Sequence, residues 1–180
     1  MKHFLTHFIQ ENYRAGRLHG QFRAATMFID LSGFTRLTEK LMRQGGAEGA
    51  EALSNTLNYI FRPTVELVYA RQGFIPYFAG DSFTAIFPCD SKTPGAAAET
   101  AQLALRVMQT AQATLRRFAT DQENEESLLA EYNIGIKIGL SEGEVEWGIV
   151  GNRRKAYYFR GRPIESCAQA RSRGAQLADA

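Results

Sequence analysis

The sequence predicts an α+β fold, in which a mainly antiparallel sheet carries helices on one face. The predicted elements follow the order helix, strand, long helical pair, hairpin, helix, hairpin, helix, which differs from the strict βαβ alternation of a Rossmann fold. Neither GxxxxGK[ST] nor GxGxxG occurs in the chain. With 180 residues, 44% of them hydrophobic, the chain has the size and composition of one globular domain.

The first half of the chain alternates helical and extended patterns. Apolar residues between 3 and 18 recur on one side of a helix, and the run AATMFIDL at 24–31 has the length of a buried strand that Ser32 and Gly33 close. Helical patterns follow at 35–43 and, after the break at Gly45 and Gly46, up to about Arg71. Pro63 should kink or end this second helix, although the apolar pattern continues beyond it.

The second half predicts two hairpins and two helices. Two short aromatic and β-branched runs flank Ala79, Gly80 and Asp81, so we expect a hairpin with Asp81 at its tip. The remaining predictions are a helix at 103–118, a charged loop at 121–126, strands at 132–140, 145–150 and 156–159, and a last helix that Gly161 opens. We divide the chain into an N-terminal helix at 1–20 and a main domain at 21–180.

Composition excludes several kinds of partner. The net charge of +2 is too small to predict binding to nucleic acid or to an acidic membrane surface, although basic residues gather between Arg153 and Arg173. The N-terminus has no uninterrupted apolar span, so no membrane segment is expected. Cys89 and Cys167 form no metal-binding spacing and are typical of reduced thiols, which favours a cytoplasmic location.

Two acidic residues stand where strands are predicted to end. Asp30 closes an apolar run, and Asp81 lies between Gly80 and the next strand. Such carboxylates often serve only as turn or cap residues. Together they could hold one or two Mg²⁺ or Mn²⁺ ions, because these hard cations accept a few protein carboxylates and take further oxygens from phosphates.

The turn after Asp30 favours phosphate binding. Gly33 allows the chain to turn tightly after Ser32, and the amides of Phe34 and Thr35 then begin a helix. Amides at a helix start have no partner within the helix and attract anions such as a triphosphate.

The segments FIDLSGFTRLTE, FAGDSFTAIF, IGIKIGLSEGEVEWGIVG and YYFRG, in this order, resemble the class III adenylate and guanylate cyclase catalytic domain. The resemblance extends from about Ala24 to Arg173 and is strongest to the first, metal-binding domain of the soluble-type adenylate cyclases. It implies a ferredoxin-like, palm-type fold, two metal ions on Asp30 and Asp81, and help from the Leu31 carbonyl. The residues implied to hold the triphosphate are Ser32, Gly33, Phe34, Thr35 and Gly80.

The resemblance also implies a dimer, since these cyclases build each active site between two domains. One domain supplies metals and the phosphate turn, and the other supplies base-reading and transition-state residues. In this chain the base-reading Lys and Asp are replaced by Tyr77 and Tyr158, and the transition-state Asn and Arg by Glu165 and Gln169. A carboxylate would repel triphosphate, and glutamine lacks the required charge.

Arg153, in the turn GNRRK, matches an arginine expected to bind the triphosphate, although the same turn is typical of a solvated hairpin tip. These features predict half of a cyclase that converts ATP to cyclic AMP and pyrophosphate. The second domain would lie in trans, in a homodimer, or in a longer chain, because residue 180 precedes the closing strands that the resemblance implies. The alternatives are an inactive nucleotide-binding, dimerisation or regulatory module, and a palm relative of the diguanylate cyclase type. ATP is favoured over GTP.

Overall fold

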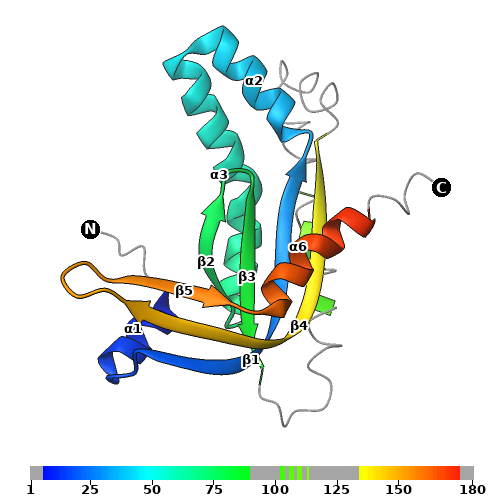
Figure 1. Cartoon of the computed structure of the whole chain (residues 1–180). Helices are drawn as coiled ribbons and strands as arrows, with labels where there is room; N and C mark the ends of the chain where they lie inside the picture. Colours follow the sequence, from blue (N-terminus) through cyan, green and yellow to red (C-terminus); the bar gives the residue numbers. More distant parts are fainter. Residues whose placement is uncertain are drawn as a thin grey trace.

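The computed structural model describes residues 6–89, 102, 103, 106, 107, 109, 110, 113 and 134–174. Within them a five-stranded, wholly antiparallel sheet has the order β2-β3-β1-β4-β5 (Figure 1). The strands are β1 (His19–Ser32), β2 (Phe74–Ala79), β3 (Ser82–Pro88), β4 (Gly135–Val150) and β5 (Ala156–Arg160). The predicted α+β antiparallel architecture is therefore confirmed.

Two helices cover one face of the sheet, here called the α3 face. The helices α2 (Phe34–Gly45) and α3 (Ala47–Ala70) confirm the predicted helical pair, and α3 continues through Pro63. Alternate residues of β1, among them Met27 and Ile29, are fully buried against α3 residues such as Ile60 and Val68. This cluster is the main hydrophobic core.

The last helix, α6 (Arg162–Gly174), lies on the opposite face, here called the α6 face. Thr26 precedes Met27 on β1, so its side chain points to the opposite face of the sheet. Its hydroxyl donates a 2.8 Å hydrogen bond to the Pro163 carbonyl at the start of α6. Figure 1 shows α6 in front of the sheet and α3 behind it. The prediction that helices cover one face of the sheet therefore holds for α2 and α3, whereas α6 covers part of the opposite face.

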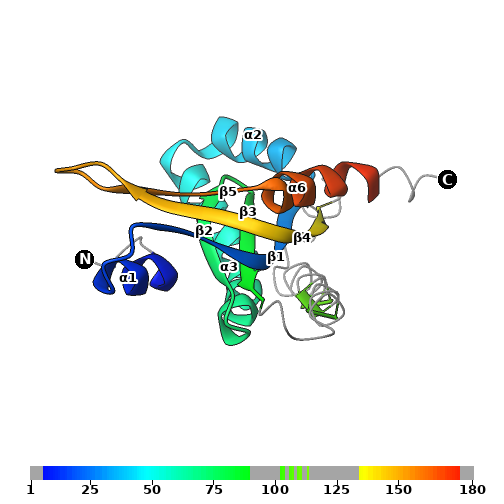
Figure 2. The same ribbon diagram turned by 60° about the horizontal axis from the view of Figure 1, so that its bottom comes forward.

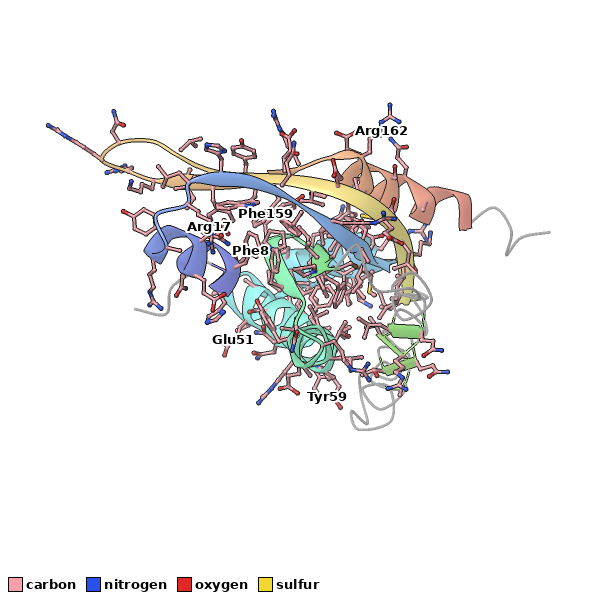
Figure 3. All side chains as sticks on the ribbon, turned by 90° about the horizontal axis from the view of Figure 1, so that it is seen from below. Phe8, Arg17, Glu51, Tyr59, Phe159 and Arg162 are labelled. Atoms are coloured by element: carbon pink, nitrogen blue, oxygen red, sulfur yellow. The ribbon has the colours of Figure 1, made fainter. Side chains whose placement is uncertain are left out.

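The N-terminal helix α1 (His7–Arg14) packs against the sheet. Thr6 caps it, and the Phe8 ring lies 4.9 to 5.8 Å, centroid to centroid, from Phe22, Phe74, Trp147 and Phe159. Figure 3 shows Phe8 and Phe159 facing one another. Strand β1 begins at His19, shortly after α1 ends at Arg14.

Strand β4 is longer than the sequence predicts. The two strands expected at 132–140 and 145–150 are one continuous strand, which pairs with β1 from Ser32 to His19. The connecting residues keep this pairing, and the Arg23 guanidinium forms a 2.9 Å ion pair with Glu142 there. Together β4 and β5 form a hairpin that projects from the sheet beside α1 (Figure 2).

Parts of two predictions lie outside the described residues. These are most of the helix at 103–118 and the whole charged loop at 121–126, although Leu103 and Val107 are helical and buried in the core. Among the described helices, none combines the length and apolar character that crossing a membrane requires.

Candidate active site

The two predicted metal ligands lie at the same edge of the sheet. Asp30 is the register partner of Ser82, the residue after Asp81. The backbone amide of Leu31 donates a 3.1 Å hydrogen bond to the Asp81 carbonyl. The β1–β3 pairing therefore brings together two carboxylates that are about fifty residues apart in sequence.

The turn between β2 and β3 holds Asp81 in place. Gly80 has a φ of 61°, a left-handed conformation that glycine adopts without strain. The Ser82 hydroxyl donates a 2.9 Å hydrogen bond to the Ala79 carbonyl and so closes the turn. A side chain on Gly80 would meet no atom within 4 Å, so the turn is open to solvent on this side.

The N-terminus of α2 begins directly after Asp30, Leu31 and Ser32. Gly33 precedes the helix with a φ of 79°, and no side chain caps the first amides. The Phe34 side chain is buried and Thr35 is exposed, so Phe34 can offer only its amide to a ligand. No acidic residue lies in the first turn, which suits an anion at this helix end.

A cation that the sequence analysis missed lies beside Asp30. Lys137 on β4 is the register partner of Asp30, so both side chains leave the α6 face of adjacent strands. Lys137 is half-buried. Because Lys137 lies between Ile136 and Ile138, the alternation of the strand predicts which face its side chain points to. The sequence does not predict that Asp30 lies on the neighbouring strand.

Arg153 does not join this group within one chain. It follows the far end of β4, where Gly148 pairs with His19 at the opposite end of β1 from Asp30. Within one chain the long β4 therefore separates Arg153 from Asp30, whereas Lys137 is the register partner of Asp30.

Tyrosines occupy both positions that are expected to read a base. Tyr77 and Tyr158 are both exposed, and the Arg160 guanidinium lies 5.5 Å from the Tyr158 ring centroid. The neighbouring Tyr157 hydroxyl donates a 2.7 Å hydrogen bond to the Pro76 carbonyl on β2. Tyr157 rather than Tyr158 thus links β5 to β2.

The donor set fits a hard divalent cation bound jointly with phosphate. Among the described residues no cluster of three or more His, Cys, Asp or Glu occurs, so within this part of the chain Asp30 and Asp81 have no third such side chain beside them. Mg²⁺ commonly takes one or two carboxylates and completes its shell with water and substrate phosphates. Such a donor set can hold a divalent cation together with phosphate oxygens beside the uncapped start of α2.

Comparison with known proteins identifies the family of the chain. The profile of the family described as "Adenylate and Guanylate cyclase catalytic domain" matches residues 20–178. The chain belongs to this family. Over 139 residues it is 32% identical to the adenylate cyclase type 10 of Oryctolagus cuniculus and of Homo sapiens, covering 77% of this chain and 8% of those proteins. The chain thus spans about a twelfth of the length of these relatives.

Solved structures show the same fold at lower identity. A bacterial light-regulated adenylyl cyclase aligns with a TM-score of 0.72 and 19% identity, over 97% of this chain and 48% of that chain. The adenylyl cyclase CyaB from P. aeruginosa gives 0.66 and 21%, over 86% and 74% of the two chains. A class III adenylyl cyclase-like ATP-binding protein from Pseudomonas aeruginosa gives 0.71 and 16%, over 86% and 32%.

Proposed function

We propose that the chain is the metal- and triphosphate-binding half of an adenylate cyclase, which requires a complementary cyclase domain for activity. The observation that carries this proposal is the Leu31 to Asp81 hydrogen bond, which fixes both aspartates beside the start of α2. Similarity to adenylate cyclase type 10 favours ATP as the substrate.

In the proposed reaction the ribose 3′-oxygen of ATP attacks the α-phosphorus. A new O–P bond forms as the bond to the leaving pyrophosphate breaks, and the 3′ proton passes to solvent. Two bound Mg²⁺ or Mn²⁺ ions would lower the pKa of the attacking hydroxyl and neutralise the leaving phosphates. Asp30, Asp81 and the Leu31 carbonyl would hold these ions.

The remaining contacts orient the triphosphate. The amides of Phe34 and Thr35 face the phosphates at the helix start, while Ser32 with the glycines at 33 and 80 permits the close turns. Lys137 supplies positive charge on the neighbouring strand. Because Tyr77 and Tyr158 occupy the base-reading positions, base reading is left to the complementary domain. Glu165 and Gln169 likewise leave transition-state stabilisation to that domain.

The direct test is calorimetric binding of a non-hydrolysable ATP analogue with Mg²⁺. The wild-type chain should bind only with the metal, and Asp30→Asn and Asp81→Asn should each weaken binding on the order of tenfold or more. Glu48→Gln, an exposed carboxylate in the first turn of α3, is the matched control and should bind as wild type. Unchanged affinity in both aspartate variants would refute the site.

A second candidate is a nucleotide-binding module without catalysis. Glu165 and Gln169, both exposed on α6, occupy the positions of the transition-state residues, which favours this function if the chain pairs only with itself. An ATP-binding relative of cyclase fold provides a parallel. Metal-dependent binding that never leads to cyclic AMP, even with a complementary domain present, would distinguish this module from the enzyme.

A further inference from the structure

A hydrogen bond joins the two opposite edges of the sheet. Strands β2 and β5 are the outer strands of the described sheet, with β3, β1 and β4 between them. Neighbouring strands lie about 4.8 Å apart, so the edges of a flat five-stranded sheet would be about 19 Å apart. The Tyr157 hydroxyl on β5 nevertheless donates a 2.7 Å hydrogen bond to the Pro76 carbonyl on β2. The sheet therefore curls until its edges come within the reach of one side chain.

A β-bulge on β2 places the acceptor of this bond. The register of β2 against β3 shifts between Phe74 and Tyr77, so Ile75 and Pro76 lie opposite a single residue of β3. The extra residue of a bulge is left without a partner on the neighbouring strand. Proline suits this place, because it has no N–H to give to the strand ladder. The bulge thus allows the Pro76 carbonyl to point toward β5, where Tyr157 reaches it.

Aromatic rings fill the inner side of the curled sheet. The rings of Phe74 on β2 and Phe159 on β5 have centroids 5.2 Å apart, and the Phe8 ring of α1 lies 5.1 and 5.8 Å from them (Figure 3). The Tyr157 ring meets Phe159 edge-on, with 6.0 Å between the centroids. Phe8 and the hydrogen bond of Tyr157 therefore hold the same two outer strands from the same side.

The Tyr157 hydroxyl keeps the proton that it donates at neutral pH. Burial is the main cause of a raised pKa of Tyr157, and the nearby Tyr69 adds to it. The Tyr157 side chain is half-buried, which partly shields the hydrogen bond from competing water. A hydrogen bond in such a setting is electrostatically stronger than one in bulk water. Its loss should therefore change how firmly β5 is held against β2.

The orientation of β5 determines where two candidate site residues of the β4–β5 hairpin lie. Tyr158 follows Tyr157 and points to the other side of β5, where its ring lies over Gly148 of β4, so closely that a Cβ on Gly148 would be 2.6 Å from it. Arg153 lies in the turn between β4 and β5. The cyclase resemblance assigns both positions to nucleotide binding. A hairpin that changed its angle would carry both residues with it.

We propose that Tyr157 and Phe8 are positioning residues, which hold the β4–β5 hairpin in the orientation that a complementary cyclase domain binds. This rests on the proposed function, since it concerns the same two-domain site. If the hairpin has the required orientation for only part of the time, the apparent affinity for the domain is reduced by that fraction. The net contribution of one hydrogen bond corresponds to a change in population of roughly two- to tenfold.

The experiment compares the wild-type chain with Tyr157→Phe, which removes only the hydroxyl. Trp147 is the single tryptophan and lies 4% exposed beside Phe8, so its quenching by acrylamide should increase when the hairpin is released. Calorimetry should show a several-fold weaker affinity, up to about tenfold, for a cyclase domain with Lys, Asp, Asn and Arg at the substituted positions. Binding of the Mg²⁺-ATP analogue should be unchanged, because Asp30 lies at the other end of β1.

Two further variants separate positioning from stability. Phe8→Ala should increase quenching of Trp147 and weaken binding of the domain, as Tyr157→Phe does. Ile60→Val, fully buried in the main core on α3, is the control: it lowers the free energy of unfolding by an amount comparable to the loss of one hydrogen bond. Its Trp147 quenching and its affinity for the domain should equal those of the wild type.

The proposal is overturned if Tyr157→Phe matches the wild type in quenching or in affinity for the domain, or if Ile60→Val weakens that affinity equally. A wild-type chain that binds neither the Mg²⁺-ATP analogue nor the domain would instead refute the proposed function. Quenching of Trp147 would still decide whether Tyr157 holds the hairpin, so the two failures are distinguishable.

Discussion

Lys137 and Arg153 give opposite expectations for phosphate binding, since one is the register partner of Asp30 and the other follows the far end of the same strand. We predict that Lys137→Met weakens binding of Mg²⁺-ATP analogue roughly tenfold, because a charge-assisted contact to phosphate is lost. Lys137→Arg should restore most of the affinity, and Arg153→Met should have little effect in the isolated chain. Calorimetry measures the affinity of the three variants. A larger loss of affinity in Arg153→Met than in Lys137→Met would indicate that the phosphate contact lies on the hairpin.

Gly33 has the backbone conformation that the α2 start requires. Its φ of 79° costs an L-residue about 1 kcal/mol, so we predict that Gly33→Ala lowers the free energy of unfolding by about that amount. Gly33→Asn should cost less, because asparagine tolerates the left-handed region. Urea unfolding of both variants provides the measurement, and equal losses would indicate that the backbone conformation is not the cause.

At the residue scale, the sequence predicts what local chain geometry determines. Asp30, Gly33 and Asp81 could be identified because a strand end, a tight turn and a helix start each have a short pattern. Lys137 could not, because its neighbour is set by the register of β1 against β4. The role of Arg153 stays a prediction, because it comes from a resemblance in sequence, which contains no information about distance along a strand.

At the element scale, α1 is held by a cluster of aromatic rings rather than by the chain connection alone. Phe8 is half-buried and has four aromatic neighbours, so we predict that Phe8→Ala lowers the free energy of unfolding by about 2 kcal/mol, below the range for fully buried phenylalanines. Tyr13→Ala, on the exposed side of α1, is the control and should cost under about 1 kcal/mol. Equal losses in thermal unfolding would contradict this docking.

Element boundaries were predictable where turn residues interrupt a periodic pattern. Gly46 separates α2 from α3, and the hairpin of β2 and β3 surrounds Gly80 as expected. The single strand β4 was not predictable, because Ser141 to Glu144 lack an apolar alternation and are kept extended by their pairing with β1. The place of α6 on the second face likewise depends on a tertiary contact, from Thr26 to Pro163.

At the scale of the whole molecule, the contact between α6 and the sheet makes stability depend on pH. Burial raises the pKa of the Cys167 thiol, and a hydrogen bond with Thr26 partly opposes this. The unfolded thiol, with a pKa of about 8.5, then loses its proton first, so the free energy of unfolding is complete below that pH and falls as pH rises above it. Urea unfolding between about pH 8 and 9.5 measures this decline.

The pH dependence has a matched control in the other cysteine. Cys167→Ala should flatten the decline, and Cys89→Ala, at a half-exposed position, should preserve it. Above about pH 9.5 the raised pKa of Tyr157, caused mainly by burial, contributes as well, so the comparison is confined to the lower range. A decline that persists unchanged in Cys167→Ala would assign it to another group.

The proposed cyclase site is complete only when a second cyclase domain is present. We predict that the isolated chain produces little cyclic AMP from ATP, since Tyr77, Tyr158, Glu165 and Gln169 cannot supply base reading or transition-state charge. Adding a cyclase domain that carries the complementary Lys, Asp, Asn and Arg should raise the rate by a factor on the order of 10² or more.

That activity must depend on this chain's own carboxylates. Asp30→Ala and Asp81→Ala should each abolish the gain, while both variants still bind the complementary domain, which size-exclusion chromatography measures. A gain that survives Asp30→Ala would show that the added domain works alone. No gain, despite complex formation and metal-dependent ATP binding, would favour the non-catalytic module, because the phosphates would then be held by a site that no partner completes.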